Sequence, residues 1–168
     1  MSVIVTSAGG PCAENAIRNL KIADSIHVIG TDVDEYMLQL SSADEKVVVH
    51  QASEATGLYV KDINDIAQKH SSTMFMPVSD REIYITALNA ARLPKASIPS
   101  VDVVTVCRNK SLLFQFMSLY DFPIPQTIYD VDKPLDIHEP MWMRAAVGAG
   151  GYLAQEVSSA EDIAAYLH

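Results

Sequence analysis

Two basic side chains and a cluster of glycines have the chemistry to hold phosphate groups. Arg144 ends an apolar run, and Gly148, Gly150 and Gly151 follow it closely. The planar guanidinium of arginine matches phosphate oxygens, and glycines let backbone N–H groups approach a ligand. Lys110 stands upstream, at the start of a segment with a helical apolar stripe. This set predicts a phosphate-binding loop, and a plain hairpin turn with a surface arginine is the alternative.

The glycine-rich loop differs from the P-loop of nucleotide-binding proteins. A P-loop needs Lys and then Ser or Thr where a helix begins, but residues 152–157 after these glycines have the pattern of a strand. Residues 141–146 before them have the pattern of a strand as well. We therefore expect a strand, a glycine-rich loop and a second strand, an arrangement that can fold over phosphates as a flap.

The elements that position these residues begin with a repeating pattern in residues 1–95. Short β-branched runs alternate there with amphipathic segments. We expect strands at residues 2–7, 26–34, 45–50 and 73–78, and helices at residues 11–21, 58–70 and 80–93. Strands that alternate with helices predict a parallel sheet covered by helices, with the carboxyl ends of the strands at one edge. The expected fold class is therefore α/β.

The pattern changes near residues 95–100. Beyond this point we expect a short strand at residues 97–98, helices at residues 102–108 and 110–120, and then the hairpin around the glycines. Ser158 and Glu161 have the spacing of a capping box at the start of a last helix. We place a domain boundary at the change in pattern, which gives domains at residues 1–97 and 98–168.

Several short motifs follow one another in an order that carries a resemblance. They are "NK" (Asn109 and Lys110), "FPIP" (residues 122–125), "MWMR" (residues 141–144) and "VGAGG" (residues 147–151). In this order and spacing they resemble the ATP-grasp superfamily. The stretches "VTSAGGPCAENAIRNL", "IGTDVDEYMLQLSSADEKVVV" and "MPVSDREI" resemble the Rossmann-like pre-ATP-grasp domain of proteins related to the carbamoyl-phosphate synthase large chain. The resemblance implies this domain at residues 1–97 and a small α+β subdomain, the first of an ATP-grasp module, at residues 98–168.

The resemblance also implies roles for the basic residues and the glycines. At the matching positions, Lys110 and Arg144 would contact the phosphates of ATP, and Gly148, Gly150 and Gly151 would cover them. Family members are ATP-dependent ligases that join a carboxylate to an amine or a thiol through an acyl phosphate. The implied partners are small-molecule carboxylate and amine substrates, and the family allows a homodimer through the N-terminal domain. A binding or regulatory module that keeps the fold without catalysis is the alternative.

Two features depart from the family pattern, and one part of that pattern lies beyond the sequence. Asn109 stands where the family has an acid, and residues 122–125 lack the usual glycine. Family members hold Mg²⁺ on a further domain that follows the flap. We therefore expect these 168 residues to be a fragment of a longer enzyme, without metal ligands or catalytic activity of their own. Mg²⁺ is expected only with the missing C-terminal part.

A dinucleotide site is a rival interpretation of the first domain. Gly9 and Gly10 follow the first strand, and Asp32 ends the second strand, where a dinucleotide-binding protein has a ribose-binding acid. The G-x-G-x-x-G fingerprint is absent, because the two glycines are adjacent. We therefore favour ATP over NAD(P) and keep these three residues as candidates for substrate binding.

A second candidate for substrate binding follows the fourth strand. Ser79, Asp80 and Glu82 stand there, and ligands of parallel sheets bind beyond the carboxyl ends of strands. We expect Asp80 to cap the next helix, and contact with a carboxylate or amine substrate is the alternative.

Composition narrows the classes of function. The net charge is −9, and the lack of a Lys/Arg cluster argues against nucleic-acid binding. The five histidines are scattered, so we assign none of them a catalytic role. Cys12 and Cys107 lack CxxC spacing and have no histidine cluster nearby, so we expect no metal site. No apolar run reaches membrane-spanning length, and the N-terminus lacks the pattern of a signal peptide. We expect a cytoplasmic protein with reduced thiols.

Overall fold

The computed structural model describes residues 1–22, 26–129, 137, 139–148, 151 and 153–167. It divides the chain into two compact units, Met1–Val104 and Thr105–His168. None of the described helices is both long and apolar enough to cross a membrane.

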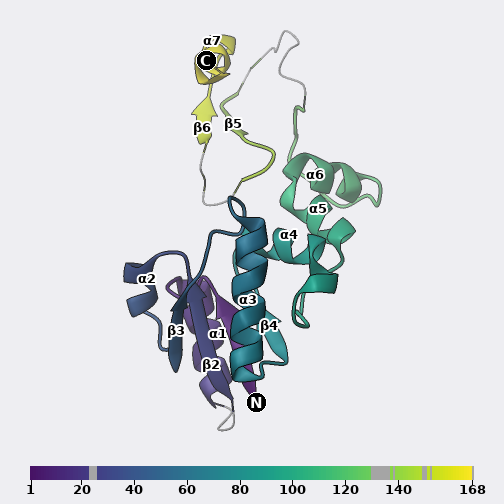
Figure 1. The fold of residues 1–168 in the computed structure, drawn as a ribbon. Coiled ribbons are helices and arrows are strands. Elements are labelled where there is room, and N and C mark those ends of the chain that lie inside the picture. Colours follow the sequence, from purple (N-terminus) through teal and green to yellow (C-terminus); the bar gives the residue numbers. More distant parts are fainter. Residues whose placement is uncertain (23–25, 130–136, 138, 149–150, 152, 168) are drawn as a thin grey trace. The chain divides into compact units, whose positions relative to one another are not determined.

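The first unit is built on a parallel sheet of four strands. β1 (Ser2–Thr6), β2 (His27–Asp32), β3 (Glu45–Val48) and β4 (Met74–Met76) are arranged in the order β3-β2-β1-β4. Every adjacent pair is parallel, so the carboxyl ends of the strands meet at one edge of the sheet (Figure 1). The α/β fold class expected from the sequence is confirmed.

Helices cover both faces of this sheet. They are α1 (Pro11–Ile22), α2 (Glu35–Gln39), α3 (Thr56–His70) and α4 (Asp80–Leu88), followed by the 3-10 helix η1 (Ala90–Arg92). Successive residues of β1 point to opposite faces of the sheet. Val3 and Val5 pack in one core with Ile17 of α1. Ile4 packs in a second core with Ile63 of α3, so the β-branched run is buried on both faces, as is typical of parallel sheets.

Helix α2 begins directly after the residues predicted as the second strand. The second strand was expected to reach Asp34, but it ends at Asp32 because Asp34 caps α2. One carboxylate oxygen of Asp34 accepts hydrogen bonds from the backbone N–H groups of Tyr36 (2.8 Å) and Met37 (3.1 Å). These bonds satisfy two of the N–H groups that a helix start leaves without partners.

The end of the first unit is less regular than expected. The helix expected at residues 80–93 ends at Leu88, and η1 follows it. The strand expected at residues 97–98 is instead a single parallel bridge between Ala96 and Phe75.

The position of α2 explains one glycine of the adjacent pair. A Cβ atom at Gly9 would lie 2.4 Å from the backbone carbonyl group of Met37, so an alanine there forces the two segments apart. We expect Gly9→Ala to lower the free energy of unfolding by roughly 2 kcal/mol. Gly57→Ala is the matched control, because Gly57 stands in the first turn of α3 with open space around it. Helix propensity predicts that this second change stabilises the chain by roughly 0.5–1 kcal/mol. Urea denaturation measures both, and equal effects would contradict the packing argument.

The second unit contains helices and a hairpin. α5 (Val101–Arg108) runs from the first unit into the second, and α6 (Lys110–Ser118) follows it. β5 (Met141–Arg144) pairs antiparallel with β6 (Ala154–Val157), and α7 (Ala160–Leu167) comes last. The expected order of strand, glycine-rich loop and strand is confirmed.

The cap of α7 differs from the expected one by one position. The Ser159 hydroxyl accepts a hydrogen bond from the N–H group of Asp162 (3.1 Å), and the Asp162 carboxylate accepts one from the N–H group of Ser158 (2.8 Å). The bond from Ser158 is the main cause that lowers the pKa of Asp162. The capping box predicted from Ser158 and Glu161 is therefore wrong, because two overlapping pairs with the same spacing stand side by side in the sequence.

Candidate functional site

Lys110 is the first residue of α6, and Asn109 determines where this helix starts. The side-chain oxygen of Asn109 accepts hydrogen bonds from the N–H groups of Ser111 (3.0 Å) and Leu112 (3.2 Å). Asparagine and aspartate cap helices about equally well. Asn109 therefore provides the helix start that positions Lys110, as an aspartate at this position would.

Lys110 lies directly against the glycine-rich loop. Its backbone N–H group donates to the carbonyl oxygen of Ala146 (2.9 Å), and its Nζ donates to the carbonyl oxygen of Gly148 (2.8 Å). An isolated antiparallel bridge joins Asn109 to Val147. The start of α6 and the first part of the loop thus form one structure, and the ammonium group of Lys110 lies beside the loop backbone.

Packing against described neighbours does not require a glycine at either of the two described glycine positions of the loop. Gly148 has a φ of 153° and Gly151 a φ of 73°, and no described neighbouring atom lies within 4 Å of a Cβ built at either residue. The φ of Gly151 lies in the left-handed region that favours glycine. Gly150, the third glycine of the predicted set, lies outside the described residues. Open space above a glycine backbone is what the close approach of a ligand needs.

Arg144 ends β5 on an exposed face of the hairpin. It stands opposite Ala154, whereas Trp142, on the same face, stands opposite Glu156. Among the residues that the structure describes, no acidic side chain forms an ion pair with Arg144. One residue, Ala145, separates Arg144 from Ala146, whose carbonyl oxygen accepts the hydrogen bond from Lys110. The guanidinium group is therefore available to an anion near the start of the loop.

Three solved structures resemble nearly the whole chain. The L-amino acid ligase of Bacillus licheniformis matches 96% of it at a TM-score of 0.68, with 12% sequence identity. Biotin carboxylase of Campylobacter jejuni, solved as a β-γ-ATP complex, matches 98% at a TM-score of 0.67, with 21% identity. N5-carboxyaminoimidazole ribonucleotide synthetase of Thermotoga maritima matches 98% at a TM-score of 0.62, with 16% identity. This chain has the fold of the matched part of these ATP-grasp proteins.

The chain is much shorter than these structural neighbours. It covers 39% of the ligase, 40% of the biotin carboxylase and 42% of the synthetase, so it spans about two fifths of their length. No protein-family model matches the chain, and no curated protein matches it by sequence.

In the first unit of the chain, Asp32 and Gly9 lie together. Asp32 Oδ2 accepts a hydrogen bond from the Gly9 N–H group (3.0 Å), and Asp32 Oδ1 accepts one from the Asp34 N–H group (3.1 Å). The Gly10 N–H group donates to the carbonyl oxygen of Ser7 (2.9 Å). Gly9 also faces the backbone of Met37. Both carboxylate oxygens of Asp32 thus accept hydrogen bonds from the chain itself, and the chain fills the space over Gly9. These contacts weigh against a dinucleotide at this position.

Glu82 is the centre of a hydroxyl network at the carboxyl edge of the sheet. Its side chain is buried, and its Oε2 accepts hydrogen bonds at 2.7 Å from the hydroxyl groups of Thr6, Ser7 and Ser79. Burial first, and then the charge of Glu82, raise the pKa of the Tyr59 hydroxyl, so this neighbour remains neutral. The carboxylate of Glu82 is therefore used in joining β1 to the start of α4.

Ser79, and not Asp80, caps helix α4. The Ser79 hydroxyl accepts a hydrogen bond from the Glu82 N–H group (3.3 Å), and Glu82 accepts one from the Ser79 N–H group in return (3.3 Å). The cap predicted at Asp80 is wrong, because serine followed by glutamate three residues later completes a capping box. Asp80 is exposed in the first turn of α4, so among these three residues it remains the one open to a substrate.

Proposed function

We propose that this chain provides the ATP-phosphate site of a ligase that joins a carboxylate to an amine or a thiol, as carbamoyl-phosphate-synthase-like proteins do. The observation that carries the proposal is the contact of Lys110 Nζ with the Gly148 carbonyl oxygen (2.8 Å), beside loop glycines that face open space. The names of the structural neighbours, an amino acid ligase, a carboxylase and a synthetase, support the same class of reaction.

The residues of the second unit suit a polyphosphate. Lys110 brings a mobile positive charge, which can exchange the Gly148 carbonyl oxygen for a phosphate oxygen. Arg144 brings a planar fork of donors that fits two phosphate oxygens. Gly148 and Gly151 let backbone N–H groups come close to the ligand. ATP supplies the phosphoryl group that activates the carboxylate, and these residues hold and neutralise its phosphates, which is most of what phosphoryl transfer asks of a protein.

Magnesium ligands belong to a further part of the protein in this proposal. Within the described residues, three metal-ligating side chains come together in one place only, in the first unit, and none of those three is a neighbour of Lys110 or Arg144 in the sequence. The chains of the three neighbours are more than twice as long. A fourth structural neighbour, the biotin carboxylase domain of the Hydrogenobacter thermophilus 2-oxoglutarate carboxylase, was solved as a dimer in complex with MgADP. We propose that this chain binds ATP without hydrolysing it. Its partners would be small-molecule carboxylate and amine substrates and a second copy of the chain.

A comparison of ATP with NAD⁺ tests this function. We expect isothermal titration of the purified chain to show saturable ATP binding, with a dissociation constant on the order of a millimolar or tighter. Inorganic tripolyphosphate should compete with ATP, because the site holds the phosphates, whereas NAD⁺ should not bind measurably. A chain that binds NAD⁺, or that binds ATP with no competition from tripolyphosphate, would contradict the proposal. Binding without turnover in an otherwise complete enzyme would favour the regulatory module.

A further inference from the structure

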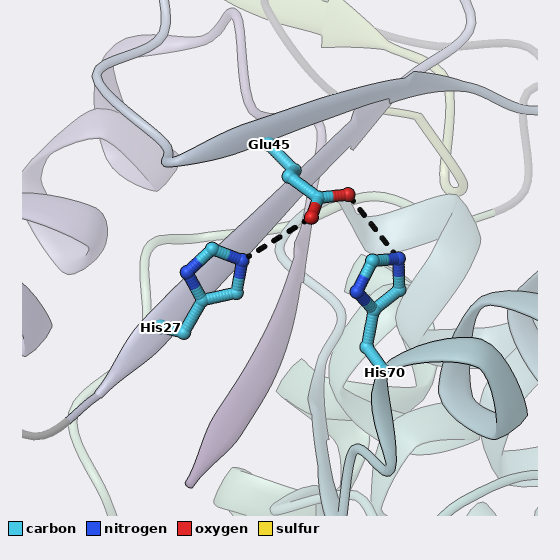
Figure 2. A group of neighbouring side chains, drawn as sticks. All are labelled: His27, Glu45 and His70. Carbon is cyan, nitrogen blue, oxygen red and sulfur yellow. Dashed lines mark ion pairs between the residues drawn. The ribbon is translucent and has the colours of Figure 1, made fainter.

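Two histidines and one glutamate lie together at the edge of the parallel sheet where its strands begin. His27 begins β2, Glu45 begins β3 and His70 ends α3. Because the strands are parallel, this edge is formed by their amino ends, and Asp32 and Glu82 lie at the other edge. Figure 2 shows the Glu45 carboxylate between the two imidazole rings, with one nitrogen of each ring turned toward it.

The three side chains are spaced as ligands of one small cation. His27 Nε2 lies 3.5 Å from Glu45 Oε1, and His70 Nε2 lies 3.2 Å from Glu45 Oε2. One ligand atom from each residue lies within 4.8 Å of the other two. A tetrahedral zinc ion with ligands at about 2.0–2.1 Å separates neighbouring ligand atoms by about 3.3 Å. Each imidazole nitrogen lies at about this separation from one of the two Glu45 oxygens, and an ion would draw the three ligand atoms, now within 4.8 Å of one another, together.

His70 offers a ligand atom that lacks a satisfactory partner. The side chain is 11% exposed, and its Nε2 is shielded from solvent without a well-formed hydrogen bond to any described residue. A buried polar nitrogen left in this state costs free energy, which a ligand would recover. The Ser2 hydroxyl donates to the His70 carbonyl oxygen (2.7 Å), so the backbone beneath the ring is tied to β1.

The surroundings of the cluster favour a cation. His70 is the last residue of α3, a helix of 15 residues, and a helix carboxyl end attracts positive charge. Asp44 Oδ2 lies 3.8 Å from His27 Nδ1, on the ring nitrogen that does not face Glu45. Lys21 Nζ (2.7 Å) and the Val28 N–H group (2.9 Å) donate hydrogen bonds to Asp44, which hold this carboxylate beside His27. From there a small shift would let it orient the imidazole, as carboxylates do for the histidines of metal sites.

We propose that His27, Glu45 and His70 bind one divalent transition-metal ion of the zinc class. Imidazole ligands select ions such as Zn²⁺ over Mg²⁺ and Ca²⁺, which prefer oxygen ligands. Three protein ligands leave a fourth position for water, and the exposed ring of His27 (45%) gives the ion a way in. The ion would join the starts of two strands to the end of a helix, so it stabilises the first unit and takes no part in phosphate binding.

Lys69 is the group that competes with the ion. Its Nζ lies 3.8 Å from Glu45 Oε2, and its side chain is 71% exposed. The ammonium group and a metal ion would repel each other, and the exposed lysine can turn into solvent when the ion binds. We expect Lys69→Gln to tighten Zn²⁺ binding severalfold, whereas a cluster that only forms ion pairs would show no such gain.

The test is a Zn²⁺ titration of the whole chain with Cys12→Ser and Cys107→Ser, which remove two exposed thiols. We expect one Zn²⁺ per chain and, at about a hundred times the dissociation constant, a rise in melting temperature of roughly 5–10 °C. His27→Ala should weaken binding at least about tenfold. His50→Ala is the matched control, because His50 pairs with one described carboxylate, that of Asp62 (2.7 Å), and should leave Zn²⁺ binding unchanged.

The outcomes separate a metal site from a simple charge cluster. His27 is exposed, so its replacement leaves the fold intact, and circular dichroism checks this. His70→Gln gives a second variant that loses a ligand nitrogen while keeping a polar side chain of similar length. Absence of Zn²⁺ binding, or binding that is as tight in both variants as in the chain that keeps both histidines, overturns the proposal. Equal affinities for Zn²⁺ and Mg²⁺ would also overturn it, because two imidazoles do not suit Mg²⁺.

Discussion

Replacing Glu82 with alanine is expected to lower the free energy of unfolding by about 3 kcal/mol or more. The change leaves the buried hydroxyl group of Thr6 without its acceptor and removes the acceptor of Ser7 and Ser79 as well. It also removes one half of the capping box of α4, which contributes roughly 1 kcal/mol in comparable helices. Urea denaturation followed by circular dichroism measures the loss.

Asp80→Ala is the matched control for this prediction. Asp80 is an acid of the same helix turn as Glu82, but it is exposed, so its removal should cost well under about 1 kcal/mol. Glu82→Gln should fall between the two, because it keeps the side-chain volume and one acceptor oxygen while it loses the charge. If Glu82→Ala and Asp80→Ala lower the free energy of unfolding equally, the hydroxyl network around Glu82 does not stabilise the junction of β1 and α4.

Replacing Lys110 or Arg144 with alanine is expected to weaken ATP binding by roughly 10- to 100-fold each. Charge-assisted hydrogen bonds to phosphate contribute about 1.5–3 kcal/mol, and each variant loses one charged donor. Arg144→Lys should retain part of the affinity, because it keeps the charge but not the planar fork. Lys61→Ala is the matched control, since Lys61 pairs with Asp65 on the surface of α3. Calorimetric titration of the four variants with ATP makes the comparison.

The parallel sheet could be predicted from the sequence because local residue preference and burial in the fold favour the same strands there. The run at residues 2–7 is β-branched throughout, and Val3, Ile4 and Val5 are fully buried on two faces, so local preference and tertiary packing favour the same strand. The pattern did not predict α2, because the helix has only five residues and its N-cap, Asp34, stands at the end of a run that otherwise resembles a strand. Its signal was the cap: an aspartate followed by Glu35, which is favourable in a first helical turn.

The residues of the candidate site differ in how far the sequence alone could define them. The order of Lys110, Arg144 and the glycines predicted a phosphate loop, but the hydrogen bond from Lys110 to Gly148 depends on tertiary structure. Gly9 illustrates the opposite case, because adjacent glycines suggested a ligand while the structure shows the Met37 backbone over Gly9. A sequence does not reveal whether a glycine accommodates a ligand or its own chain.

The histidine cluster shows the same limit for a metal site. His27, Glu45 and His70 come from two strands and a helix, with no short spacing that marks a ligand set. Only the register of parallel strands brings His27 and Glu45 to one edge, and only the length of α3 places His70 beside them. The expectation of no metal site rested on the spacing of residues along the sequence. Spacing does not show which residues parallel strands bring together at one edge of a sheet.

The most direct test of the central claim is to locate ATP on the chain by nuclear magnetic resonance. In an isotope-labelled chain titrated with ATP, we predict the largest changes in amide chemical shift at Lys110, Gly148 and Gly151, with Gly9 and Asp32 unaffected. Tripolyphosphate should cause the same changes at Lys110 and Gly148, because the phosphates make the contacts. Changes centred on Gly9 and Asp32, with none at Lys110 or Gly148, would contradict the account and place the ligand at the edge of the parallel sheet.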